Sequence, residues 1–114
     1  MTAPRLSLRI DLPNGTRFGP GKAALLSALC ETGSIRAAAE QLQMSYPRAL
    51  KLIDQMNDSF ASPLVETKHG GADGGGTHVT AEGREVLSLY QAICETAETN
   101  STEAFQKLSR HIRD

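Results

Sequence analysis

Three polar residues in the middle of the chain have the spacing of one helix face and side chains that suit nucleic acid. Arg48, Lys51 and Gln55 lie at positions i, i+3 and i+7, so a helix through them would present them together. An arginine can read guanine with two hydrogen bonds, and lysine and glutamine can reach phosphates or bases. Two cations on a helix are also typical of a solvated surface, so the interpretation depends on the elements that carry these residues.

The elements before these residues have the pattern of a helix-turn-helix. Gly33 is a typical C-terminal stop for an amphipathic helix expected over residues 22–32. Ser34 then suits the N-cap of an alanine-rich helix over residues 35–42. A short polar turn separates this second helix from the third, as in a helix-turn-helix.

The third helix is expected to begin at a cap formed by Ser45 or Tyr46 and to fade near residue 57. Pro47 falls in its first turn, where the missing N–H costs nothing. The second helix of a helix-turn-helix pair lies in the major groove, and its first turns meet base edges. The residues predicted to meet DNA there are Ser45, Tyr46, Pro47, Arg48 and Lys51, with Gln55 one turn further.

A β-hairpin with a glycine-rich tip is expected to follow the third helix. Strands are predicted over residues 64–68 and 77–79, joined by a loop at 70–76 that is mostly glycine. The loop lacks the Gly-Lys-Ser/Thr sequence of a phosphate-binding P-loop. We expect a wing tip that approaches the DNA backbone or minor groove, flanked by Lys68, His69 and His78; the alternative is a simple connection.

The fold class expected is mainly α with a small β-hairpin, namely a winged helix-turn-helix with a long C-terminal dimerisation helix. One domain over residues 1–114 is expected, with a helical DNA-binding core at 22–60, the wing at 64–79 and C-terminal helices at 80–114. Thr80 suits the cap of the long helix, and a short last helix follows an interruption near Asn100 and Glu103.

A homodimer is predicted because two amphipathic elements need a neighbour. Residues 6–12 alternate apolar and polar side chains like a half-buried strand, and the long helix has a wide apolar stripe. The alternative is that both elements pack on the chain's own core. The residues predicted to form the dimer contact are Leu8, Ile10, Val86, Leu87, Tyr90, Ile93, Cys94 and Ala97.

Composition and spacing argue against other classes of protein. The net charge of −1 means that only one face can be basic, which is sufficient for a DNA reader. Cys30 and Cys94 form no CxxC, the three histidines lack the spacing of metal ligands, and no nucleophile motif such as GxSxG is present. We therefore expect no enzyme, cofactor or metal. Without a signal peptide or transmembrane run, a cytoplasmic protein is expected.

The chain resembles, from about residue 6 to residue 95, the N-terminal DNA-binding domain of the molybdate-responsive ModE regulators, close relatives of LysR-type winged helices. The specific parts are Gly33-Ser34-Ile35, Met44-Ser45-Tyr46, Met56-Asn57, Leu64-Val65-Glu66, the glycine loop at 70–76, and Thr80 with Gly83. The glycine-rich wing is the more selective of these.

This resemblance implies a transcription regulator that dimerises through its N-terminal strand and long helix and reads DNA with its third helix. Carried over by position, Ser34 and Arg36 would touch phosphates. Members of the family continue into molybdate-binding domains, whereas this sequence stops at Asp114, so no molybdate binding is expected. Pro47 also departs from the family pattern, so the family's operator sequence is not carried over.

Two functions follow from the sequence. The favoured one is a sequence-specific regulator that binds double-stranded DNA as a homodimer. The alternative is a winged helix used for protein–protein contact, as in an adaptor or antirepressor, in which Arg48 and Lys51 would face a protein or solvent. The dependence of duplex binding on salt separates the two.

Overall fold

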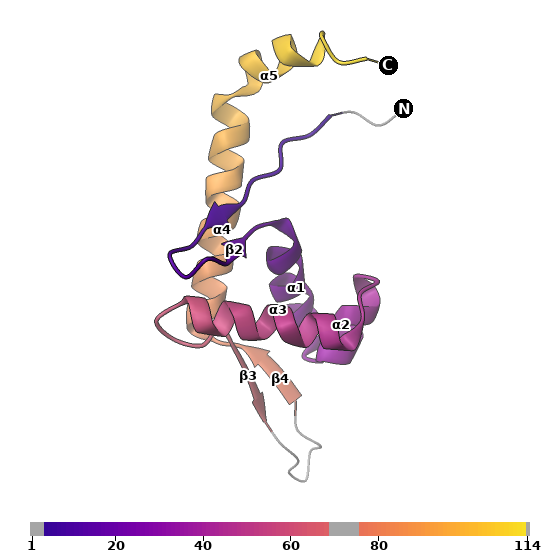
Figure 1. Ribbon diagram of the computed structural model, residues 1–114, viewed down its shortest axis with the longest axis vertical. Coiled ribbons are helices and arrows are strands. Elements are labelled where there is room, and N and C mark those ends of the chain that lie inside the picture. Colours follow the sequence, from indigo (N-terminus) through magenta and orange to yellow (C-terminus); the bar gives the residue numbers. More distant parts are fainter. Residues whose placement is uncertain (1–3, 69–75, 114) are drawn as a thin grey trace.

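The computed structural model describes residues 4–68 and 76–113 (Figure 1). Within these residues the chain forms five α-helices and two small β-hairpins, so the predicted mainly α fold class is confirmed. The elements are β1 (Ile10–Asp11), β2 (Arg17–Phe18), α1 (Pro20–Thr32), α2 (Ile35–Gln41), α3 (Tyr46–Ser59), β3 (Val65–Lys68), β4 (Gly76–Val79), α4 (Ala81–Asn100) and α5 (Thr102–Ser109).

Helix α1 forms the centre of the core, and α2, α3, α4 and β4 all pack against it. Its leucines Leu25, Leu26 and Leu29 are completely buried. The helix begins at Pro20, two residues before the predicted start, because the fixed φ of proline suits the first turn. It ends as predicted at Gly33, whose φ of 66° is left-handed and whose N–H bonds to the carbonyl of Leu29.

The turn between α2 and α3 is held by local hydrogen bonds. The hydroxyl of Ser34 accepts from Ala37 N at 3.1 Å and caps α2, as predicted. Gln43 adopts a left-handed φ of 57°, which reverses the chain sharply. Ser45, not Tyr46, is the cap of α3, because its hydroxyl accepts from Arg48 N at 3.2 Å.

The wing is an antiparallel pair in which Val65 lies opposite Val79. Asn57, near the end of α3, binds the start of the wing: its Oδ1 accepts from Leu64 N at 2.8 Å and its Nδ2 donates to Val65 O at 3.0 Å. The wing is therefore tied to the helix that precedes it. His69 and most of the glycine loop, for which a wing-tip contact with DNA is predicted, lie outside the described residues.

The strand predicted over residues 6–12 is wrong except at Ile10–Asp11. These two residues pair with Arg17–Phe18 in a hairpin that the sequence did not predict, and residues 6–9 form no strand. The alternating pattern has another cause: Leu8 and Ile10 are half-buried along one side, and the carbonyl of Leu8 accepts a hydrogen bond from Tyr90 Oη at 2.5 Å. The segment thus lies beside α4 (Figure 1).

Helix α4 begins at its predicted cap, since Thr80 Oγ1 accepts from Gly83 N at 3.0 Å. The predicted interruption before a short last helix is confirmed at Ser101. The N-cap of α5 is Ser101, without a side-chain cap hydrogen bond, and Glu103 pairs with Lys107 one turn on, at 3.1 Å. Within the described ranges, no helix is long and apolar enough to cross a membrane.

Candidate nucleic-acid interface

The first two turns of α3 are open to solvent. Ser45, Tyr46, Pro47, Arg48 and Lys51 are all exposed, and Gln55 is half-buried. The opposite side of the helix is anchored in the core by three apolar residues, so α3 is held rigidly while its outer surface stays free. Those buried residues are Ala49, Ile53 and Met56.

Arg36 and Tyr46 connect α2 to the start of α3. The guanidinium carbon of Arg36 lies 5.0 Å from the centroid of the Tyr46 ring, which is a cation–π contact. This contact holds a positive charge beside the first turn of α3. Both residues are predicted from the sequence to contact DNA. Their contact with each other was not predictable, because it depends on how the two helices cross.

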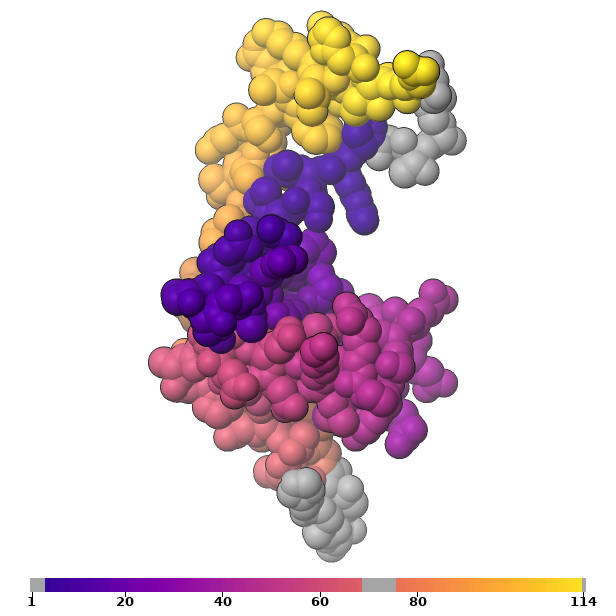
Figure 2. Space-filling view, in the orientation of Figure 1, coloured from indigo at the N-terminus to yellow at the C-terminus, as the bar shows by residue number. Residues whose placement is uncertain are grey.

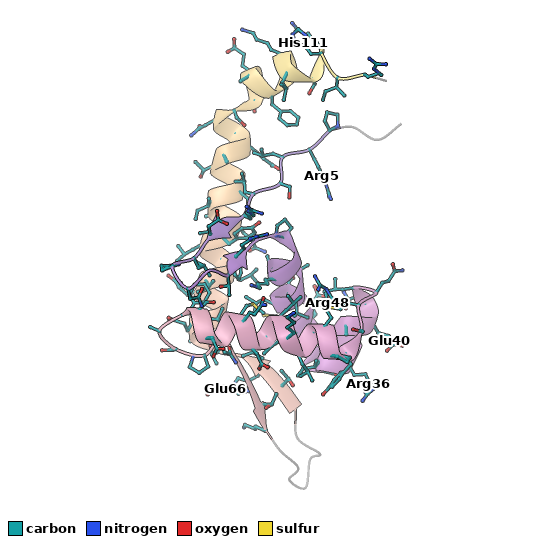
Figure 3. The ribbon with its side chains drawn as sticks, in the orientation of Figure 1. Arg5, Arg36, Glu40, Arg48, Glu66 and His111 are labelled. Carbon is teal, nitrogen blue, oxygen red and sulfur yellow. The ribbon has the colours of Figure 1, made fainter. Side chains whose placement is uncertain are left out.

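A cleft of about 450 Å³ separates α3 from the wing; we call it the wing cleft. It brings together four of the predicted DNA-binding residues from three elements: Ser34, Arg36, Tyr46 and Lys68. Arg36 lies below α3, toward the wing, whereas Arg48 projects from the front of the helix (Figure 3). The remaining lining residues are Gly33, Ile35, Leu50, Thr67, Gly76 and Thr77.

A second cleft, of about 390 Å³, lies between α3 and the β1–β2 hairpin; we call it the hairpin cleft. Arg48 and Gln55 line it, whereas Lys51, on the same face of α3, lines neither cleft. The sequence missed the other cations here, Arg17 and Lys22. The turn at Pro13–Gly15, which reverses the chain toward α3, was the available signal.

The predicted dimer residues fall into two groups. Leu87 and Tyr90 are buried in the chain's own core, 9% and 6% exposed, which leaves them little surface for a partner. Ile93 is 49% exposed, and Leu89, which the sequence analysis missed, is 54% exposed one turn away. The others are half-buried: Leu8, Ile10, Val86, Cys94 and Ala97.

Helices α2 and α3, the turn between them and the β3–β4 wing define a winged helix-turn-helix. The chain has the fold of CbnR_DBD in the crystal structure of the CbnR_DBD–DNA complex, with a TM-score of 0.59 over 77% of this chain and 95% of that one, at 23% identity. Residues 22–84 match the bacterial regulatory helix-turn-helix proteins of the lysR family. The chain belongs to this family, which is one of regulators and not a class of enzymes.

Curated relatives agree with the resemblance to ModE. The chain is 35% identical to the molybdenum transport protein ModE of Azotobacter vinelandii over 100% of its own length and 42% of the relative's. It is 38% identical to the molybdenum-pterin-binding protein MopB of Rhodobacter capsulatus, covering 82% of this chain and 34% of that protein. For the DNA-binding transcriptional dual regulator ModE of Escherichia coli K12, the identity is 32%, over 79% and 33%. The chain thus spans less than half of each of these relatives.

Proposed function

We propose that this chain binds double-stranded DNA in the cytoplasm as a homodimeric, sequence-specific transcription regulator and inserts α3 into the major groove. The exposed N-terminal half of α3, anchored from behind and flanked by two clefts, is the observation that carries this proposal. The names of the relatives support it, since the Escherichia coli protein is a DNA-binding regulator and CbnR_DBD was solved with DNA.

The diameter of an α-helix favours insertion of α3 into the major groove over binding to a flat surface. A helix with its side chains is about 10–12 Å across, and the major groove of B-DNA is about 12 Å wide. With α3 in the groove, the exposed residues of its first turns face base edges. They are Ser45, Tyr46, Pro47, Arg48 and Lys51, followed by Gln55.

The wing cleft suits one DNA backbone. Arg36 and Lys68 supply positive charge on its two sides, and the amide end of α2 lies at Ser34. In this proposal Ser34, Arg36 and Lys68 contact phosphates and fix the register of α3, and His69 approaches the same backbone. Such contacts position the protein without reading sequence.

A second copy of the chain is proposed to cover the outer face of α4. The buried residues of α4 all lie in its first half, none beyond Tyr90, and α5 has no buried residue. The far half of α4 and α5 stand above the body formed by α1, α2 and α3 (Figure 2). Leu89 and Ile93 point outward from α4 at helical spacing, which suits pairing with the same face of a second chain.

The test is selection of bound sequences from a random duplex pool, followed by affinity measurements on the selected site at several salt concentrations. We expect one enriched, two-fold symmetric site and an affinity that falls linearly with salt on a double-logarithmic plot. Binding that selects no sequence or does not depend on salt would contradict the proposal. It would favour the protein–protein alternative.

No cofactor, metal or molybdate is assigned to this chain. Across the residues that the structure describes, no group of three or more His, Cys, Asp or Glu side chains could hold a metal ion. We propose separately that added molybdate leaves the melting temperature unchanged, and a thermal melt tests this. A ligand present at 100 times its dissociation constant would stabilise the fold by about 2.7 kcal/mol, which a thermal melt detects easily.

A further inference from the structure

The hairpin cleft gathers positive charge without any acidic lining residue. Three of its lining residues are cations, from three different elements: Arg17 of β2, Lys22 of α1 and Arg48 of α3. The rest of the lining is neutral and consists of Gly15, Thr16, Leu52 and Gln55. Like charges gathered in one hollow repel each other, so the cleft favours an anion.

These cations have no carboxylate partner among the residues that the structure describes. The ion pairs found there join Arg9 to Asp11, His78 to Glu66 and Lys107 to Glu103. Asp11, the acid opposite Arg17 in the hairpin, is thus engaged by Arg9 at 3.3 Å.

Lys22 fixes the back of the hairpin cleft. Its ammonium donates to the carbonyl of Arg17 at 2.6 Å, and the residue is only 8% exposed. Burial, and then the positive charge of Arg17, lower the pKa of Lys22. An anion in the cleft would oppose both effects, because it would stabilise the charged ammonium.

The hairpin is fastened to α3, so the cleft has a fixed shape. Asn14 Nδ2 donates to Ser59 Oγ at 3.0 Å, and the hydroxyls of Thr16 and Ser59 lie 2.7 Å apart. Phe18, next to Arg17, is 2% exposed and packs edge-on against Phe60 at 6.0 Å. Arg17 therefore stands on a rigid support beside the helix proposed to read DNA.

We propose that the hairpin cleft binds a backbone phosphate of the DNA strand on the side of the major groove opposite the wing cleft. This inference rests on the proposed function. A helix that fills the groove meets one sugar-phosphate backbone on each flank, and α3 has a cation-lined cleft on each flank. Arg17 is the principal phosphate ligand, Lys22 supports it from behind, and Arg48 lies at the border between the cleft and the bases.

The test combines Arg17→Gln with duplexes that carry one neutral methylphosphonate at each position of the selected site. We expect one position, on the strand away from the wing, where the neutral linkage weakens the parent but not the variant. The variant should also show a log–log salt slope smaller by about 0.9, the value for one phosphate contact. Arg5→Gln is the matched control, because Arg5 lies far from α3 (Figure 3), and it should keep the parent slope.

If the parent binds the selected site and Arg17→Gln responds to every neutral linkage as the parent does, the inference is overturned while DNA binding stands. If the parent binds no duplex, the proposed function fails, and this inference fails with it. Stabilisation by inorganic phosphate without DNA, combined with an unchanged duplex affinity in Arg17→Gln, would assign the cleft to a free anion and would also overturn the inference.

Discussion

Arg48 lines the hairpin cleft and Lys51 lines neither cleft, and single substitutions should separate their roles. Arg48 lies in the first turn, where helices of this class meet base edges. Arg48→Ala should weaken binding to the selected site by about 1–3 kcal/mol and relax the preference at one base position. Lys51→Ala should weaken all duplexes more evenly, because a lysine at this face can reach a phosphate as well as a base edge.

The measurement is the affinity of each variant for the selected site and for single-base variants of it. Arg84→Ala, an exposed change on α4, serves as the control and should behave like the parent. Unchanged affinity in both α3 variants would mean that α3 is not the reading element.

Because of Tyr90, we expect the free energy of unfolding to fall in alkaline solution. Burial, and secondarily a hydrogen bond with the Cys94 side chain, raises the pKa of Tyr90 from 10.0 to about 12. The pKa of Tyr90 is higher in the folded chain than in the unfolded chain. The contribution of Tyr90 to the free energy of unfolding is therefore complete below pH 10 and is lost as the pH rises through 12.

Chemical denaturation between pH 9 and about 12 measures this loss. Tyr90→Phe should be less stable near pH 7, because the bond to Leu8 O is lost, but should lose less stability on the way to high pH. Tyr46→Phe changes the other of the two tyrosines, which is exposed, and is the matched control. Parallel curves for the parent and Tyr90→Phe would contradict this assignment.

Single residues were predictable where local chemistry decides their role. Ser34, Gly33 and Thr80 act as the sequence indicated, because a cap or a stop depends only on neighbouring backbone. Arg17 and Lys22 were missed, since their significance comes from a cleft built by three elements distant in sequence. A helical stripe likewise cannot separate Leu87, which is buried, from Leu89, which is exposed, without knowledge of what covers each.

At the scale of elements, the junction between α4 and the wing depends on one glycine. Gly83 is buried in the first turn of α4, and a Cβ there would collide with the carbonyl oxygen of Leu64 and lie 2.6 Å from Val79 Cγ1. Gly83→Ala should therefore force α4 away from the wing and destabilise the chain by about 1–3 kcal/mol.

Gly21→Ala is the matched control for this prediction, because nothing lies within 4 Å of a Cβ at that position of α1. It should stabilise the chain by about 0.5–1 kcal/mol, since alanine is favoured over glycine in a helix. Urea denaturation of both variants measures the two effects. If both variants change the free energy of unfolding equally and with the same sign, the space around Gly83 does not determine the effect of the substitution.

The helices and the wing were predictable from the sequence, whereas the β1–β2 hairpin was not. The ends of α1, α2 and α3 lie within two residues of the predicted ones, because caps, stops and periodicity are local signals. Strands of two residues have no such signal, and Arg17–Phe18 forms one only because Phe18 is buried against Phe60 and Tyr90. Long-range packing therefore decides this part of the fold and, with it, the hairpin cleft.

At the scale of the whole molecule, the elongated shape has a consequence for DNA recognition. The longest extent of the chain is 57 Å, because α4 and α5 continue past the core (Figure 2). Two chains joined through these helices would present two copies of α3. For a two-fold symmetric site, the copies must lie about 34 Å apart, one turn of B-DNA.

The dimer proposal predicts that acidic residues on the outer face of α4 separate the chains without unfolding them. Leu89→Glu combined with Ile93→Glu changes two side chains that are about half exposed within one chain, so the core should keep its stability. Two carboxylates brought against the same face of a second chain would lose solvation and repel each other. The variant should be a monomer with much weaker binding to the two-fold site.

Sedimentation equilibrium at micromolar concentration gives the direct test. The parent should have the mass of two chains, and the double variant the mass of one with an unchanged circular dichroism spectrum. Gln91→Glu is the matched control, because Gln91 is exposed about half a turn around α4 from Leu89 and Ile93, and it should stay dimeric. A parent that sediments as a single chain would remove the dimer from the proposal. DNA binding would then have to be tested against a single half-site.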